Sequence, residues 1–205
     1  MNQVLEFIHN GGVMMYPLIL CSIILISLTL ERAITFRKLT TDGDDLLDEI
    51  KELYKPGGDP TRAIEACEKQ GILGMMFARG LRNSAREPDA IEMALEFEAA
   101  SEIPNLEANL PVVKTIVNIA PLLGLLGTIF GMIASFRVAS AAGLSNPTQI
   151  LGGISEALVS TASGITVAII GFLVHNYFAN LGKKTMDDLE YYGAEFVNYV
   201  SGRVD

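Results

Sequence analysis

The sequence predicts an all-α integral membrane protein, with three transmembrane helices extended by a helical cytoplasmic domain. Residues 10–30 and 115–136 contain no Asp, Glu, Lys or Arg, and residues 138–182 contain only Glu156. Each run reaches the roughly 20 residues that cross a hydrocarbon core of about 30 Å. The acidity lies elsewhere, because residues 39–110 hold sixteen acidic against seven basic side chains. This distribution favours membrane spans joined to one water-facing segment.

The spans are expected near residues 12–34, 112–138 and 148–178. The first lacks a basic segment before it, so it is interpreted as a retained anchor and not as a signal peptide. Basic residues follow the first and third spans, and by the positive-inside rule they place the amino terminus outside and the carboxyl terminus inside. The expected divisions are 1–38 (outward amino terminus and first span), 39–110 (cytoplasmic helical domain), 111–138 (second span), 139–147 (outward loop), 148–180 (third span) and 181–205 (cytoplasmic carboxyl-terminal helix).

The cytoplasmic segment is expected to be helical throughout. An amphipathic stretch at 44–54 is followed by a Pro- and Gly-rich break, a helix at 61–70 begun by a Thr cap, and a further helix to about Arg86. Pro88 then opens a long helix, which Pro104 and Pro111 are expected to bend before it enters the membrane. No strand pattern interrupts this series.

Composition also excludes several classes of function. A formal net charge of −9 argues against nucleic acid, whose phosphates require a basic face. Cys21 and Cys67 lie far apart without a metal-ligand spacing, so neither a disulfide framework nor a metal site is predicted. With no nucleotide-binding loop, no catalytic constellation and two His residues, we expect no enzyme and no cofactor.

The second span carries small and hydroxyl side chains at helical spacing. Gly124, Thr128, Gly131 and Ser135 follow one another at intervals of four, three and four residues, so they lie on one stripe of a helix. Small stripes let helices approach closely in lipid. Helix packing is the simpler interpretation of this stripe, and Gly127 is assigned to packing with it.

The third span contains the carboxyl group of Glu156. Inserting an acidic side chain at the centre of a transmembrane helix costs a free energy of roughly 2.5–3.5 kcal/mol. Ser160 and Ser163 lie within about 40° of it around the helix, whereas Thr161 is about 140° away on the face of Gly164. A helix with two polar or small stripes is expected to contact protein or a lumen on two sides, which predicts a close-packed oligomer. From the residues alone, two interpretations of Glu156 have equal weight: a proton carrier, and a protonated structural group.

The segments Ala120–Thr128 and Ile154–Gly164 together resemble the paired signature of the MotA/TolQ/ExbB proton channel family, more closely its ExbB/TolQ branch. The resemblance in span order and loop sizes covers essentially the whole chain. Three spans with a compact insertion differ from the four spans of the MotA branch. A flagellar stator is therefore not expected.

The resemblance implies a pentameric ring in the bacterial inner membrane, with a periplasmic amino terminus, surrounding the single span of an ExbD/TolR-like partner that carries an intramembrane Asp. It implies that Thr128 and Thr161 line the lumen and that Glu156 belongs to the polar ring. Ser135, Ser160 and Ser163 are possible lumen or packing hydroxyls. Proton flow would then drive a TonB/TolA-like effector.

Two alternatives remain at this point. One is a non-conducting membrane scaffold in which Glu156 is a structural hydrogen-bond donor. The other is a small-solute transporter, which is weaker because three spans with one long insertion show no inverted repeat.

Overall fold

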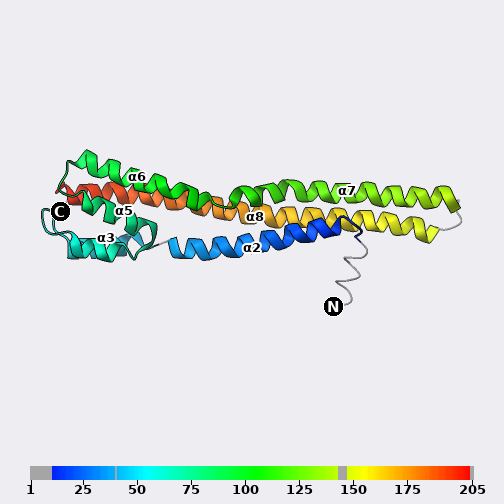
Figure 1. The fold of residues 1–205 in the computed structure, drawn as a ribbon, viewed down its shortest axis with the longest axis horizontal. Helices are drawn as coiled ribbons and strands as arrows, with labels where there is room; N and C mark the ends of the chain where they lie inside the picture. The colour runs from blue at the N-terminus through cyan, green and yellow to red at the C-terminus, as the bar shows by residue number, and fades with distance from the viewer. Residues whose placement is uncertain (1–10, 40, 143–146, 204–205) are drawn as a thin grey trace. The chain divides into compact units, whose positions relative to one another are not determined.

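The computed structural model describes residues 11–39, 41–142 and 147–203, and the regular elements in these ranges are all helices (Figure 1). Three helical stretches are long and apolar enough to cross a membrane, by length and composition. The prediction of an all-helical protein with three apolar helices is therefore confirmed. Part of the expected outward loop, at 143–146, lies outside the described residues, as do residues 1–10 of the amino terminus and 204–205 of the tail. The helices are α2 (Met15–Leu39), α3 (Gly43–Leu53), α4 (Thr61–Cys67), α5 (Gly71–Arg82), α6 (Pro88–Glu107), α7 (Leu110–Ala142) and α8 (Pro147–Val200).

The chain forms two compact units. The first unit comprises Met1–Leu30 with Asn109–Tyr177, and the second comprises Glu31–Ala108 with Phe178–Asp205. The apolar parts of α2, α7 and α8 belong to the first unit, and α3 to α6 belong to the second.

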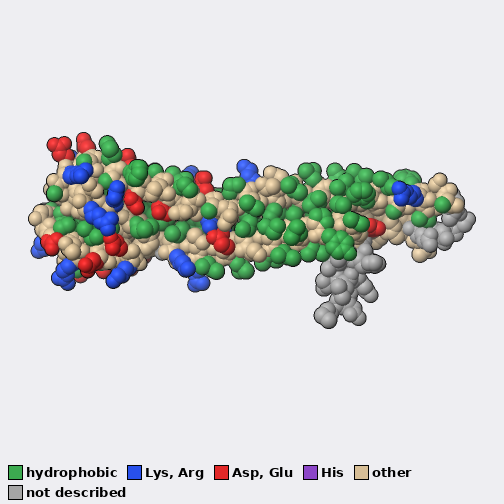
Figure 2. Space-filling model, viewed as in Figure 1, with side chains coloured by type: hydrophobic (Ala, Val, Ile, Leu, Met, Phe, Trp, Pro, Cys, Tyr) green, Lys and Arg blue, Asp and Glu red, His purple; other side chains and the backbone are tan. Residues whose placement is uncertain are grey.

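The first unit is a bundle of three apolar helices. Met15 and Leu18 of α2 are buried with Ala120 of α7 and Ala168 of α8, and Leu25 is buried with Val113 and Ile116. Large apolar side chains also face outward, and in Figure 2 hydrophobic side chains cover most of the visible face of this unit. Outward apolar side chains are typical of helices in lipid, where association depends on packing.

The second unit has a core of buried aliphatic and aromatic side chains. Leu46 and Ile50 of α3 are buried, as are Phe77 of α5 and Phe196 of α8. The rings of Phe77 and Phe196 stack with their centroids 4.7 Å apart. Aromatic pairs at this spacing contribute beyond the area they bury, so this contact helps to hold α5 against α8.

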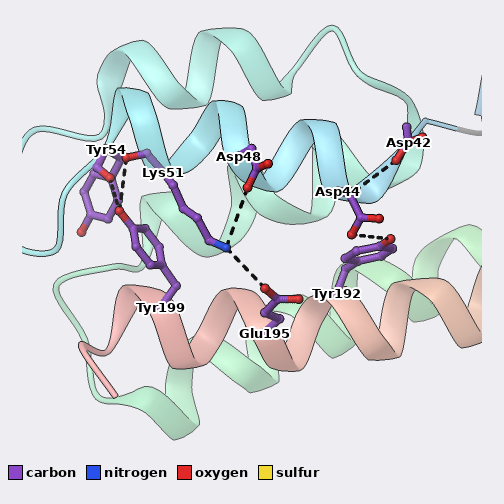
Figure 3. A network of polar contacts seen from close by, with 8 residues as sticks. All are labelled: Asp42, Asp44, Asp48, Lys51, Tyr54, Tyr192, Glu195 and Tyr199. Carbon is purple, nitrogen blue, oxygen red and sulfur yellow. Dashed lines mark hydrogen bonds and ion pairs between the residues drawn. The ribbon is translucent and has the colours of Figure 1, made fainter. Parts of the chain in front are cut away.

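Polar contacts also join α3 to the final turns of α8 (Figure 3). The Tyr199 hydroxyl donates to the carbonyl oxygen of Tyr54 at 2.8 Å, and the Tyr192 hydroxyl donates to Asp44 Oδ1 at 3.1 Å. The Lys51 ammonium lies 3.4 Å from Glu195 Oε1. These contacts join residues about 145 positions apart in the sequence, and they hold α3 against the end of α8 within the second unit.

The helix that the sequence predicts from Pro88 into the membrane is broken, not bent. α6 ends at Glu107 and α7 begins at Leu110, and between them Asn109 has a φ of 63°. Asn tolerates this left-handed conformation better than most residues. Pro104 lies inside α6, and Pro111 lies in the first turn of α7, where a proline needs no hydrogen-bond donor.

A buried arginine stabilises the end of α6. Arg32 is 4% exposed, and its Nη1 donates to the carbonyl oxygen of Asn105 at 2.9 Å. Its Nε donates to Glu31 Oε2 at 2.8 Å. A cation at the last carbonyls of a helix complements both the unpaired acceptors and the helix dipole.

The predicted Thr cap at residue 61 is wrong. Thr61 is already helical, and Asp59 Oδ1 accepts from both the Thr61 amide and the Thr61 hydroxyl, at 3.1 and 2.6 Å. α4 also ends at Cys67 and not at Gln70. Thr61 therefore lies inside the helix with its hydroxyl bound to Asp59, in an Asx-type turn, and does not cap α4.

Cys67 allows a test of the second unit's core. Its side chain is fully buried, and burial, assisted by the charges of Glu49 and Glu68, raises the pKa of its thiol to about 12 from 9.0. Because the folded-state pKa is the higher one, the stability that comes from a neutral thiol is complete below pH 9 and is lost as the pH rises toward 12. At pH 8 we expect maleimide to label Cys67 at least about 1000-fold more slowly than in the unfolded chain. Mass spectrometry of a Cys21→Ala chain measures this rate, and rapid labelling of the folded protein would contradict the buried position.

Candidate functional site

Close backbone contact between α7 and α8 forms the centre of the first unit. An ideal Cβ on Gly124 would lie 3.1 Å from the Ser160 carbonyl oxygen and from the Thr161 Cα. On Gly164 it would lie 2.5 Å from the Ala120 carbonyl oxygen. We call this contact the glycine seam, defined by Gly124, Gly127 and Gly131 of α7 with Gly153 and Gly164 of α8. Only residues without a side chain let two helices approach so closely.

The structure brings Thr161 against the seam. Its Oγ1 donates to the Gly124 carbonyl oxygen across the two helices, at 3.1 Å. Thr128 lies one turn beyond Gly124 on α7, and its Oγ1 donates to the Leu125 carbonyl oxygen of its own helix, at 2.6 Å. Both threonines are partly exposed. The two hydroxyl groups therefore donate to the carbonyl oxygens of two consecutive residues of α7.

The three serine residues have different environments. Ser135 is buried, and its Oγ contacts the carbonyl oxygens of Gly131 at 3.1 Å and of Ile150, across the seam, at 2.9 Å. Ser163 donates to the Val159 carbonyl oxygen of its own helix. Ser160 is fully buried over Gly127, and its Oγ has no hydrogen-bond partner among the described residues. Ser135 and Ser160 thus lie inside the helix pair, and Ser163 is the more exposed of the three.

Glu156 lies beside the turn that precedes α2. Gly12 has a φ of 69°, and a Cβ there would collide with the Glu156 carboxyl group. A Cβ on the neighbouring Gly11 would lie 3.1 Å from Val159 Cγ1, one turn along α8. Backbone without side chains therefore lies against the Glu156 carboxyl group, which is partly exposed. Sequence reasoning missed these two glycines, although a Gly-Gly pair directly before an apolar run was the available signal.

Glu156 and Thr161 have different neighbours, as the helical wheel of the sequence implies. The carboxyl group contacts the turn at Gly12, whereas the threonine hydroxyl contacts Gly124 of α7. Thr161 and Thr128 thus donate to the carbonyl oxygens of Gly124 and Leu125, two consecutive residues of α7, whereas the Glu156 carboxyl group contacts Gly12. Within the described residues, no three His, Cys, Asp or Glu side chains form a metal-binding group.

Comparison with known proteins identifies the family of this chain. Residues 68–191 match the MotA/TolQ/ExbB proton channel family. The chain is 34% identical over 175 residues to ExbB-like 3 of Synechocystis sp., which bears the name of a biopolymer transport protein, and the match covers 83% of this chain and 82% of the relative. It is 30% identical to the Tol-Pal system protein TolQ of Pseudomonas aeruginosa, over 64% of this chain and 59% of TolQ. It is 28% identical to the biopolymer transport protein ExbB of Pseudomonas putida, over 78% of this chain and 54% of that protein.

The family match covers more than half of the chain and includes α6, all of α7 and the polar part of α8. The ExbB-like relative extends the similarity over most of its own length. This membrane protein is therefore a member of the MotA/TolQ/ExbB proton channel family, on its ExbB/TolQ branch.

Proposed function

We propose that this chain is the channel and stator subunit of an inner-membrane motor of the ExbB–ExbD or TolQ–TolR type. Such a motor converts proton-motive force into mechanical work on an effector that spans the periplasm. The observation that carries the proposal is the hydrogen bond from Thr161 to Gly124 beside Thr128. Hydroxyl groups that donate to two consecutive carbonyl oxygens of α7, in a member of a proton channel family, support a polar site at the α7–α8 pair.

The subunit would act as one of five copies around the single span of a small partner. An Asp carboxyl group in that span would exchange protons near the hydroxyl groups of Thr128 and Thr161. One charge that crosses 100 mV releases about 2.3 kcal/mol, so several successive protons can drive a mechanical step. Glu156 would support the polar ring from its separate position beside Gly12.

In the proposed topology the amino terminus would lie in the periplasm, and α3 to α6 and the end of α8 would lie in the cytoplasm. Arg32, Arg37 and Lys38 at the end of α2, together with Lys183 and Lys184 of α8, support this orientation by the positive-inside rule. The outward apolar side chains of the first unit support contact with lipid and with neighbouring copies.

Purification of the tagged chain from its native membrane tests this function. We expect a small single-span protein with an intramembrane Asp to co-purify, and native mass measurement to give five copies of this chain. In liposomes, the complex should take up protons when a membrane potential is applied. A chain that stays monomeric or dimeric and retains no such partner would contradict the proposal and favour a non-conducting scaffold.

A further inference from the structure

An apolar face of α6 points away from the core of the second unit. Met93 and Phe97 are 69% and 68% exposed, although Ile91 and Leu95 of the same helix are buried. The Met93 and Phe97 side chains lie one turn apart on one face. Exposed large apolar side chains that cluster in this way mark interaction surfaces.

This face is the floor of a groove bordered by arginine. The groove has a volume of about 770 Å³, and Arg79, Arg82 and Arg86 line it beside Met93 and Phe97. Three of the seven basic residues in 39–110 therefore gather here. Glu87 and Asp89 also border the groove, which leaves it with a small net positive charge. We call it the basic groove.

The three guanidinium groups of the basic groove differ in whether they already pair with a carboxylate of the same chain. Arg82 pairs with Glu68, and Arg79 Nε lies 3.9 Å from Glu98. Arg86 is exposed and forms no ion pair within the described part of the chain. Arg86 is thus the cation best able to pair with an acidic group on a partner.

A complementary groove lies on another side of α6, against α8. Its floor includes Leu95, Leu189 and Val197, and its rim carries Glu92, Glu96 and Glu190, with no basic side chain in the lining. The three carboxylates are exposed and repel one another, and a repulsive pair at i and i+4, such as Glu92 and Glu96, costs a few tenths of a kcal/mol. We call this the acidic groove. A cation from outside the chain would relieve the repulsion.

The two grooves point in different directions. Glu92 and Met93 are successive residues, as are Glu96 and Phe97, so the two pairs diverge by about 100° around α6. A contact between the basic groove of one copy and the acidic groove of the next is therefore heterologous. Heterologous contacts propagate from copy to copy and close into rings when the rotation permits.

We infer that the basic groove of one copy docks on the acidic groove of the next copy of this chain. Met93 and Phe97 would cover the apolar floor between α6 and α8, and the Arg86 guanidinium would pair with Glu190. The contact rests on the proposed multi-copy assembly and assigns the surfaces that join adjacent copies outside the membrane. Charge complementarity between the two grooves favours a second copy of this chain as the occupant.

Cysteine cross-linking in whole membranes tests the contact. In a Cys21→Ala background, one tagged copy carries Phe97→Cys and a second, differently tagged copy carries Ala194→Cys, which lies in the acidic groove. We expect a disulfide-linked heterodimer from the co-expressed pair, and a ladder of higher species when one chain carries both cysteines. Glu52→Cys on the exposed face of α3 replaces Phe97→Cys in the control and should give no heterodimer.

Charge exchange gives a second measurement on the same contact. Arg86→Glu alone and Glu190→Arg alone should each lower the cross-linking yield at least about fivefold, because like charges then face each other. The two changes together should restore at least about half of the yield. Both side chains are exposed, so the fold should tolerate them.

The outcomes separate this contact from the proposed function. Five copies by native mass, with no heterodimer and no restoration in the charge exchange, would overturn the contact and leave the motor function standing. A Phe97→Cys chain that links only to itself would indicate a symmetric dimer and would also overturn it. A monomeric chain would overturn both proposals.

Discussion

Replacing Thr128 and Thr161 together by alanine is expected to abolish proton-driven activity while the chain stays assembled. The two changes remove the hydroxyl groups that donate to two consecutive carbonyl oxygens of α7. Interhelical hydrogen bonds in membranes average about 0.6 kcal/mol, with a maximum near 1.7. Loss of the bond from Thr161 to Gly124 is therefore too small to undo the packing of the glycine seam. Proton uptake into liposomes and native mass measure the two properties separately.

The same two helices supply a matched control. Thr115 of α7 and Thr166 of α8 each donate to a carbonyl oxygen of their own helix at 2.8 Å, and both are exposed. Thr115→Ala with Thr166→Ala removes the same chemical groups from positions away from the seam, so activity should be retained. If Thr128→Ala with Thr161→Ala behaves like this control, these threonines have no part in proton transfer.

Gly164→Ala is expected to destabilise the first unit strongly. The added Cβ would lie 2.5 Å from the Ala120 carbonyl oxygen and 3.0 Å from the Gly124 Cα. These are backbone atoms, so relief requires the two helices to separate. Overpacking of this kind costs typically about 1–3 kcal/mol, which lowers the thermal midpoint by about 2–12 °C in a chain of this size. Thermal unfolding in detergent, followed by circular dichroism, measures the change.

Gly152→Ala is the control for this substitution. Gly152 is exposed on the same helix, and a Cβ there would meet nothing within 4 Å. Alanine also has the higher helix propensity, by about 1 kcal/mol, so the midpoint should stay constant or rise. Equal midpoints for Gly164→Ala and Gly152→Ala would show that the backbones at the seam are farther apart than in the structure.

The main features of the first unit could be predicted from sequence because they follow from periodicity. Uncharged runs of sufficient length predict three apolar helices, and the stripe from Gly124 to Ser135 follows from 100° per residue. The separation of Glu156 from Thr161 follows in the same way. These are properties of one helix at a time, and no knowledge of its neighbours is required.

Contacts between distant segments could not be predicted. The pairing of Gly12 with Glu156, and of Arg32 with the carbonyl oxygen of Asn105, joins positions far apart in the chain. Neither leaves a periodic signal. The break at Asn109 was missed because Pro104 and Pro111 are the stronger sequence signals, although both tolerate a helical position there. Ser160 could be placed near Glu156 on the wheel, but its burial over Gly127 depends on the approach of α7.

The glycine seam has a consequence for how members of this family diverge. Because α7 and α8 meet through backbone atoms, their pairing depends on a few small residues and hardly on the identity of the outward side chains. Residues such as Leu122, Phe136 and Leu158 are largely exposed. Their replacement by other apolar residues would leave the backbone contact between α7 and α8 unchanged. Two chains that share only about a third of their residues, such as this one and ExbB-like 3, can therefore retain one helix pair while their outer surfaces evolve independently.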